Sequence, residues 1–153
     1  MPINVISVYF CAMKLAVFDF LRTFACEMSR HIIYIGMGSN LPEGEQMLLW
    51  ARQRLTEVLG REQRYSTVLR TEPVNFPSPQ PFTNQVAQVG TDLSAEEIRR
   101  QLKSLEREAG RKPGDKSCGI VRLDLDLLCF DGRVLKPQDW HRQDVVSALE
   151  ELA

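Results

Sequence analysis

Asp124 and Asp126 stand one residue apart in the stretch RLDLDLLCF, residues 122–130, which otherwise reads as an apolar strand. Asp is disfavoured in strands, so this pair needs a reason. Side chains alternate along a strand, and both carboxylates therefore point to one face while the leucines beside them point to the other. Neighbouring carboxylates repel unless a cation is present, and an oxygen-only pair suits Mg²⁺ bound together with substrate phosphates. The alternative is an exposed strand on which both aspartates are harmless.

The loop before this strand is basic. It carries four cations that could hold a polyphosphate against metal ions, namely Arg111, Lys112, Lys116 and Arg122. Positive groups in such a place act on the charge that develops during phosphoryl transfer. The cations of this loop could therefore hold a polyphosphate next to the aspartates.

Phe82 and Asn84 follow a proline-rich loop, EPVNFPSPQP at residues 72–81, and lie two residues apart on one expected strand. They therefore share a face. An aromatic ring beside an amide offers a flat heterocycle both stacking and paired hydrogen bonds. Taken singly, Phe82 could equally be a core residue, and Asn84 a turn or edge residue.

Periodicity and helix caps assign the elements that position these residues. The clearest helix spans 94–110, because Ser94 and Glu97 form a capping box and Gly110 ends the helix. Apolar spacing predicts two further helices, at 45–59 and 144–152. Strands are expected at 64–71, 82–91 and 122–130, and at 31–40, which closes in a glycine-bounded turn.

The order of the main elements is strand, helix, strand, strand, helix, strand. This order predicts an α+β fold of the ferredoxin-like, split βαβ type. In that fold two helices cover one face of an antiparallel sheet. We expect the substrate loops to cover the other face, which is the face of the two aspartates.

The composition excludes several classes of function. The chain has 153 residues and a formal net charge of -1, which gives no electrostatic footprint for nucleic acid or an anionic membrane. Its 4 cysteines form no CxxC pair and match no zinc pattern. Reduced thiols in a cytoplasmic protein are the simplest interpretation.

Residues 1–27 read as an N-terminal extension, and we expect the domain to occupy 28–153. The extension is apolar, but Lys14 and Asp19 interrupt it, and it lacks the features of a membrane span or a secretory signal. We interpret it as disordered, or as the product of a start site placed too early, because Met28 could begin the domain. A weak amphipathic helix or a partner-binding segment is the alternative.

Four stretches together resemble hydroxymethyl-dihydropterin pyrophosphokinase, an enzyme family of the folate pathway. They are YIGMGSNL, RTEPV followed by FTNQV, LEREAGR, and RLDLDLLCF. The likeness runs from about Tyr34 to Phe130. Each stretch is unspecific alone, but their combination in this order is specific.

The resemblance implies an activity. Pyrophosphate would pass from ATP, the co-substrate, to the hydroxymethyl group of 6-hydroxymethyl-7,8-dihydropterin, and AMP would be released. Asp124 and Asp126 would hold two Mg²⁺ ions. The partners would be ATP and the pterin, with no nucleic acid or membrane, and the protein would act as a monomer.

The same resemblance assigns roles to further residues. On the nucleotide side it places Arg111, which is also catalytic, together with Arg122, Lys116, Glu106 and Arg142. On the pterin side it places Asn84, Phe82 and Val74. Ser39 and Asn40 would shape the turn that supports the pocket.

Two departures from the family pattern lie near the expected site. The family has Trp-Gly-Pro-Arg-Thr before the aspartate strand, where this chain has Cys118 to Arg122 and keeps only Gly119 in register. Val121 stands in the place of a phosphate-binding arginine. Arg122 is one residue later, which in a regular strand is the opposite face. We therefore expect Arg122 to point away from the site unless the end of the loop bulges.

The tail departs further, since its WHRQDVVSALEELA keeps only Arg142 and an echo in LEELA. Asp144 or Val145 falls where the family has a second aromatic over the pterin. Trp140 or His141 could take its place. These departures favour a second hypothesis, a catalytically weakened paralogue that still binds pterin or nucleotide. A third, an RNA- or protein-interaction module, is disfavoured because the chain lacks an aromatic RNA-binding strand.

Overall fold

A computed structural model of the protein describes residues 16–17 and 30–153. Residues His31–Ala153 form one compact unit. The expected extension at 1–27 lies almost wholly outside the described residues, so its assignment stays a prediction. In chain order the elements are β1 (His31–Ser39), α2 (Gly44–Leu59), β2 (Gln63–Tyr65), β3 (Leu69–Thr71), β4 (Phe82–Thr91), α3 (Ala95–Glu108), a 3-10 turn (Lys116–Cys118), β5 (Asp124–Phe130), β6 (Arg133–Val134), α4 (Pro137–Trp140) and α5 (Gln143–Leu152).

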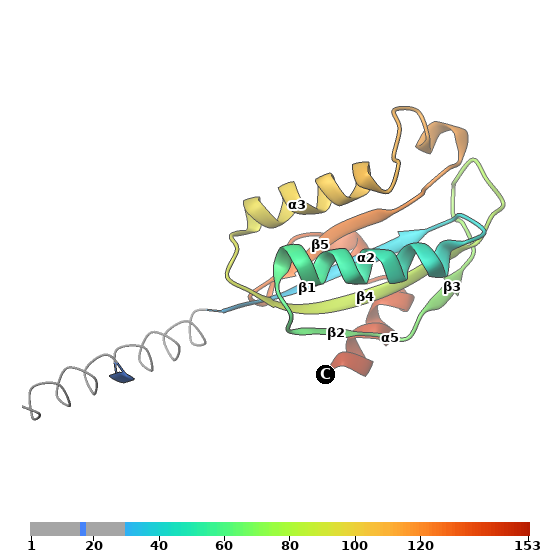
Figure 1. Cartoon of the computed structure of the whole chain (residues 1–153). Coiled ribbons are helices and arrows are strands. Elements are labelled where there is room, and N and C mark those ends of the chain that lie inside the picture. The colour runs from blue at the N-terminus through green and yellow to red at the C-terminus, as the bar shows by residue number, and fades with distance from the viewer. Residues whose placement is uncertain (1–15, 18–29) are drawn as a thin grey trace, which may run out of the picture. The chain divides into compact units, whose positions relative to one another are not determined.

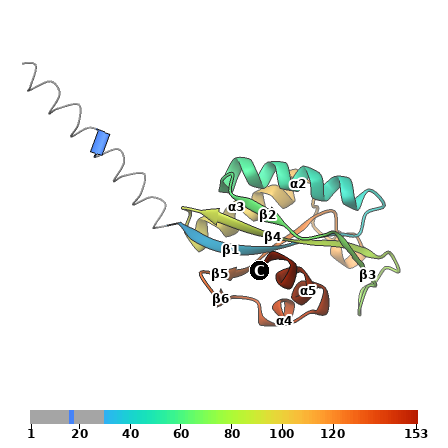
Figure 2. The same cartoon turned by 90° about the horizontal axis from the view of Figure 1, so that it is seen from below.

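The strands form one sheet in the order β2-β4-β1-β5-β6, and β3 also pairs with β4 (Figure 1). All pairings are antiparallel. Helices α2 and α3 cover one face, so the α+β, ferredoxin-like prediction is confirmed (Figure 2). The opposite face is not covered by loops alone, because α4 and α5 lie on it (Figure 2). Among the described residues, no helix is both long and apolar enough to span a bilayer.

Alternation along β5 sorts its side chains between two apolar clusters. Leu125 and Leu127 are buried in the cluster beneath α2 and α3, as the sequence predicted. Leu128 belongs to the second cluster, together with Val86 of β4 and the α5 residues Val145, Ala148 and Leu152. Burying apolar side chains of this size contributes about 1.5–3 kcal/mol each. The helices on both faces therefore hold the aspartate strand in place.

Two segments differ from the sequence prediction. The expected strand 64–71 is split into β2 and β3, because Ser66 between them leaves the regular pairing and its Oγ accepts a hydrogen bond from the Val86 N–H at 3.0 Å. Gly36 and Gly38 do not bound a turn: both lie inside β1 and pair with both neighbouring strands. The expected capping box of α3 is present, with the Ser94 N–H donating to Glu97 at 2.8 Å.

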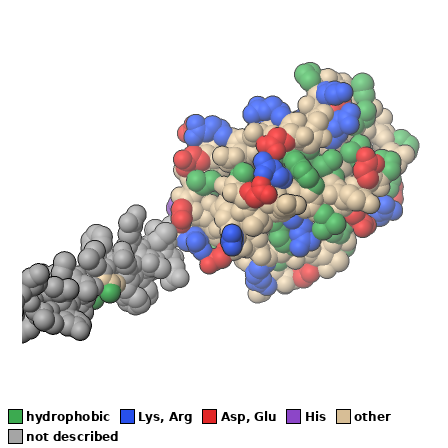
Figure 3. Space-filling view, viewed as in Figure 1, with side chains coloured by type: hydrophobic (Ala, Val, Ile, Leu, Met, Phe, Trp, Pro, Cys, Tyr) green, Lys and Arg blue, Asp and Glu red, His purple; other side chains and the backbone are tan. Residues whose placement is uncertain are grey.

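The surface of the described unit mixes charges of both signs. On the face shown in Figure 3, acidic and basic side chains are interspersed over the helices and loops. This pattern agrees with the formal net charge of -1.

Asn40 joins the end of β1 to the loop that leads into β5. Its side-chain amide donates to the Gly119 carbonyl at 2.8 Å and accepts from the Val121 N–H at 2.7 Å. Its own backbone N–H donates to the Val121 carbonyl at 2.9 Å. Asn40 is 5% exposed, so little water can reach its side-chain amide to replace these bonds. The turn that the sequence assigned to Ser39 and Asn40 thus fixes where the aspartate strand begins.

We predict that Asn40→Ala lowers the free energy of unfolding by about 2–4 kcal/mol, because it leaves the Val121 N–H and the Gly119 carbonyl buried without partners. Denaturant unfolding followed by circular dichroism measures this loss. The control is Gln53→Ala on the exposed face of α2, for which we expect a change below about 0.5 kcal/mol. A loss no larger than that of the control would contradict the structural role of Asn40.

Candidate active site

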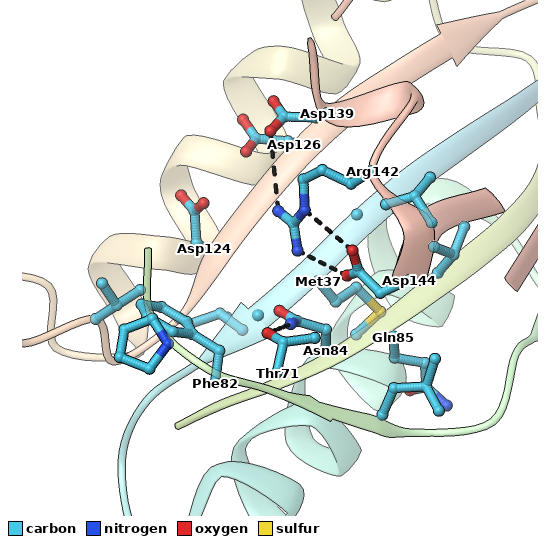
Figure 4. Close-up of a pocket in the computed structure, with 18 of the residues that line it drawn as sticks. Met37, Thr71, Phe82, Asn84, Gln85, Asp124, Asp126, Asp139, Arg142 and Asp144 are labelled. Atoms are coloured by element: carbon cyan, nitrogen blue, oxygen red, sulfur yellow. Dashed lines mark hydrogen bonds and ion pairs between the residues drawn. The ribbon is translucent and has the colours of Figure 1, made fainter. Parts of the chain in front are cut away.

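A cavity of about 640 Å³ opens on the sheet face that carries the aspartates. Its walls come from the proline-rich loop, the loop before β5 and the segment around α4 and α5 (Figure 4). The structure brings nine residues predicted from the sequence to this one cavity: Asp124, Asp126, Arg111, Asn84, Phe82, Val74, Arg122, Lys116 and Arg142. Glu106 and Lys112, which the sequence analysis also placed near the phosphates, do not line it.

The floor of the cavity is a row of paired residues on three strands. Gly38 of β1 pairs with Asp124 of β5 on one side and with Asn84 of β4 on the other. At the usual strand spacing, Asp124 and Asn84 are therefore about 10 Å apart. A Cβ on Gly38 would come within 2.9 Å of the Asn84 side-chain oxygen, so any larger residue there would displace the Asn84 amide. The row leaves an open slot between a carboxylate and an amide.

Asp124 is the carboxylate of the site whose ionised form is disfavoured. Burial, the negative charge of Asp126 and that of Glu106 raise the pKa of Asp124 from its ordinary 3.8 to about 6, against an opposing effect of Lys116. Desolvation and like charges both disfavour the ionised form. Asp124 and Asp126 thus form a pair that a cation would stabilise.

Lys136, just after β6, supplies one cation to this pair. Its ammonium donates a hydrogen bond to the carboxylate of Asp126. Burial alone would lower the pKa of Lys136, but the hydrogen bond to Asp126 and the charges of Asp126, Asp139 and Asp124 raise it. This contact was not predicted from the sequence, because Lys136 reaches Asp126 from the segment that follows β6.

Glu106 lies beneath the cavity wall rather than in it. Its carboxylate is 1% exposed and accepts the Leu125 N–H at 2.9 Å, the Arg111 guanidinium and the Lys103 ammonium at 3.1 Å. The sequence placed Glu106 on the nucleotide side, and the structure gives it a supporting position there. It ties α3 to β5 between the two aspartates and orients Arg111.

The expectation that Arg122 points away from the site assumed a regular strand, and the structure does not have one there. β5 begins only at Asp124, and Arg122 lies in a bend before it. The Arg122 Nε donates to Asp115 at 3.1 Å, and the residue lines the cavity. The opposite-face argument required a strand that already ran through Arg122, which the bend removes.

Asn84 and Phe82 face the cavity from β4, as predicted. The Asn84 amide donates to the Thr71 hydroxyl of β3 at 2.7 Å, which fixes its orientation. The Phe82 ring meets Phe76 of the proline-rich loop edge-on, with centroids 5.3 Å apart. Val74 in the same loop is 82% exposed at the mouth of the cavity. The loop therefore brings an aromatic pair and an aliphatic side chain beside an oriented amide.

The far wall carries an ion pair. The Arg142 guanidinium donates two hydrogen bonds to Asp144, at 3.1 and 2.6 Å, and approaches Asp139 at 3.8 Å (Figure 4). Trp140 does not supply the missing aromatic, because it packs edge-on against Tyr34 and does not line the cavity. His141 is exposed and does not line it either. Asp144 and Val145 form this part of the wall.

Comparison with known proteins assigns the family. The sequence model of 7,8-dihydro-6-hydroxymethylpterin-pyrophosphokinase matches residues 34–153. The chain belongs to this family. It is 32% identical over 135 residues to the 2-amino-4-hydroxy-6-hydroxymethyldihydropteridine pyrophosphokinase of Porphyromonas gingivalis (strain ATCC 33277), covering 80% of this chain and 90% of the relative. It is 31% identical over 102 residues to the enzyme of that name from Pseudomonas putida, covering 67% and 84%.

The relatives also include longer proteins. The Folate synthesis bifunctional protein, mitochondrial, of Arabidopsis thaliana is 27% identical over 138 residues, which cover 85% of this chain and 25% of that protein. The pyrophosphokinase resemblance seen in the sequence is confirmed. The match extends to residue 153, so it includes the divergent tail as well as the four motifs.

The residues of the site fit the Mg²⁺ that this pyrophosphokinase family implies. Among the described residues, no group of three or more His, Cys, Asp or Glu side chains could hold a metal. Two carboxylates on one strand suit Mg²⁺, which takes few protein ligands and completes its shell with phosphates and water. Burial and the nearby negative charges raise the pKa of Asp124, and a bound cation would oppose both effects.

Several cavity residues were missed from the sequence. Thr71, Phe76, Asp139 and Gly36 also line the cavity, and Gly36 pairs with Asp126 as Gly38 pairs with Asp124. A usable signal existed for the glycines. Two glycines at alternate positions of an apolar strand mark one bare face, which indicates close approach of another group.

We predict that the metal-free protein loses stability as the pH rises from 4 to 7 through the raised pKa of Asp124. The folded state binds the Asp124 proton more tightly than the unfolded state does, so deprotonation costs the folded state on the order of 1–2 kcal/mol. The variant Asp124→Asn lacks this contribution. Its free energy of unfolding relative to wild type should rise by that amount from pH 4 to pH 7, measured by denaturant unfolding in EDTA. Parallel pH profiles for the two proteins would refute the assignment.

Proposed function

We propose that this protein transfers pyrophosphate from ATP to the hydroxymethyl group of 6-hydroxymethyl-7,8-dihydropterin in folate biosynthesis. The hydroxymethyl oxygen forms a bond to the β-phosphorus, the anhydride bond between the α- and β-phosphates breaks, and AMP leaves. The hydroxyl proton passes to solvent. Family membership and the chemistry of the cavity both support this reaction.

Asp124 and Asp126 are proposed to hold two Mg²⁺ ions. Bound there, the metal would neutralise phosphate charge and orient the attacking oxygen. Arg111, Arg122, Lys116 and Arg142 surround the aspartates on the cavity wall and are the proposed phosphate ligands. Charge-assisted hydrogen bonds from such groups are stronger than neutral ones and strengthen as charge moves to the leaving phosphate.

The pterin is proposed to occupy the slot over Gly38. Asn84, oriented by Thr71, would read the edge of the heterocycle with its amide. Phe82, supported by Phe76, would contact the face of the ring, and Val74 would close the mouth. A pterin in this slot has its hydroxymethyl group free to point toward Asp124, because both lie over the same row of paired residues.

The observation that carries the proposal is this row of Asp124, Gly38 and Asn84 on one floor. It places the Asp124 carboxylate, which suits a metal–phosphate centre, about 10 Å from the Asn84 amide, which suits a heterocycle. Side-chain chemistry contributes little here beyond holding the two substrates in line, and such positioning alone can supply several kcal/mol of the barrier.

A second candidate function is a weakened paralogue that binds pterin or nucleotide. Asp144 in place of a second aromatic removes one stacking partner, and Arg142 is held by Asp144. The structure also supplies a counter-observation, because Arg122 lines the cavity where Val121 cannot bind phosphate. We further propose a cytoplasmic monomer, in keeping with the free thiols of Cys118 and Cys129.

We predict that the full chain releases AMP when ATP, Mg²⁺ and hydroxymethyl-dihydropterin are all present, measured by coupled AMP detection. Asp126→Asn should lower the rate by at least about a hundredfold, the scale of losing one group that stabilises transition-state charge. Glu150→Gln, at an exposed position of α5 outside the cavity lining, is the control and should keep full activity. Pterin binding without AMP release would support the paralogue instead.

Arg122→Ala provides a separate test of the bend before β5. Because Arg122 lines the cavity, we predict a loss of turnover on the order of a hundredfold, with the melting temperature nearly unchanged. Arg107→Ala, in the last turn of α3 and exposed, removes the same charge outside the cavity. Equal rates in Arg122→Ala and Arg107→Ala would show that Arg122 takes no part in transfer.

A further inference from the structure

Lys136 has a side-chain contact that the stability of its segment does not require. The Leu135 N–H already donates to the Leu128 carbonyl at 2.8 Å, and the Lys136 N–H approaches the same carbonyl at 3.4 Å. These backbone contacts fix the segment after β6 against β5. The ammonium instead reaches along the sheet to Asp126, one of the two carboxylates of the cavity floor.

The pair between Lys136 and Asp126 is built so that it can open. The Lys136 side chain is 44% exposed and that of Asp126 is 24% exposed, so water can replace either partner. Partly exposed pairs of this kind contribute little to stability. Lys136 also does not line the cavity and so reaches Asp126 from its rim.

A second anion lies close to Lys136 along the chain. Asp139, three residues on in α4, lines the cavity and is the next charge, after Asp126, that raises the pKa of Lys136. Asp139 in turn is 3.8 Å from Arg142, which is farther than the hydrogen-bonding distance between Arg142 and Asp144 (Figure 4). The rim therefore offers Lys136 another partner when Asp126 is engaged elsewhere.

We propose that Lys136 is a built-in counter-ion of the two-aspartate site, which occupies Asp126 in the metal-free protein and moves to Asp139 when a divalent cation binds. This inference rests on the proposed metal role of Asp124 and Asp126. It adds a selectivity to that role. A free divalent ion must displace Lys136 without help, whereas an ion that arrives with polyphosphate brings negative charge that also attracts the released ammonium.

The consequence is that metal alone binds weakly. The ammonium of Lys136 repels a divalent cation bound at Asp126, and its partial exposure to water weakens this repulsion without removing it. Removing its charge should therefore strengthen the binding of a free divalent ion by at least about fivefold.

The test is the binding of Mn²⁺ alone to the full chain, read from the electron paramagnetic resonance of the free ion at low ionic strength. We expect Lys136→Met to bind Mn²⁺ at least about fivefold more tightly than wild type. Arg133→Met removes a charge from the exposed end of β6 next to the same strand, and its affinity should stay within twofold of wild type. Melting temperatures of both variants report that they fold.

A double-mutant cycle tests the second half of the proposal. Asp139→Asn should weaken Mn²⁺ binding more in the wild-type background than in Lys136→Met, because only the former has an ammonium to be relocated. Equal Mn²⁺ affinities for wild type and Lys136→Met would overturn the inference and leave the pyrophosphokinase function intact. No Mn²⁺ binding to any of these proteins, with Asp126→Asn indistinguishable from wild type, would overturn both.

Discussion

The repulsion between two carboxylates on one face of a strand is the constraint around which this domain is organised. Asp124 and Asp126 cannot both be ionised cheaply where they lie, and burial makes the cost highest at Asp124. Leu125 between them and Leu127 after them lie in the core beneath α2 and α3, so the strand cannot turn the aspartates away without exposing that core. The positive charges around the pair, above all that of Lys136, reduce this repulsion.

Glu106 shows how the constraint extends into the core. A third carboxylate is buried next to the aspartates and adds to their mutual repulsion. It is tolerated because the Leu125 N–H, Arg111 and Lys103 all donate to it. The Leu125 N–H lies between the two aspartates. Glu106 therefore positions the aspartate strand and orients Arg111 at the same time.

The sequence was informative wherever local periodicity decides the answer. Alternation placed Asp124 with Asp126 and Phe82 with Asn84, and the capping box placed α3. It failed where a contact depends on a neighbouring strand or a break in regularity. Lys136 contacts Asp126 from the segment after β6. Arg122 lies in a bend before β5 instead of in a regular strand, and Glu106 lies beneath the cavity wall. A single sequence carries no record of such pairings.

The cationic wall of the cavity is self-neutralised. Arg111 is held by Glu106, Arg122 by Asp115 and Arg142 by Asp144, whereas among the described residues Lys116 makes no ion pair. In the proposed role of these cations, a polyphosphate would not enter a bare positive field but would compete with the carboxylates that already hold the guanidinium groups. Such pairing keeps the arginines in defined rotamers, which lowers the entropy lost on binding but adds the cost of each displaced carboxylate. The buried Glu106 cannot leave, so Arg111 must share its donors, while the exposed pair between Arg142 and Asp144 can open. The wall thus combines Arg111, whose carboxylate partner stays in place, with arginines whose carboxylate partners a substrate would have to displace.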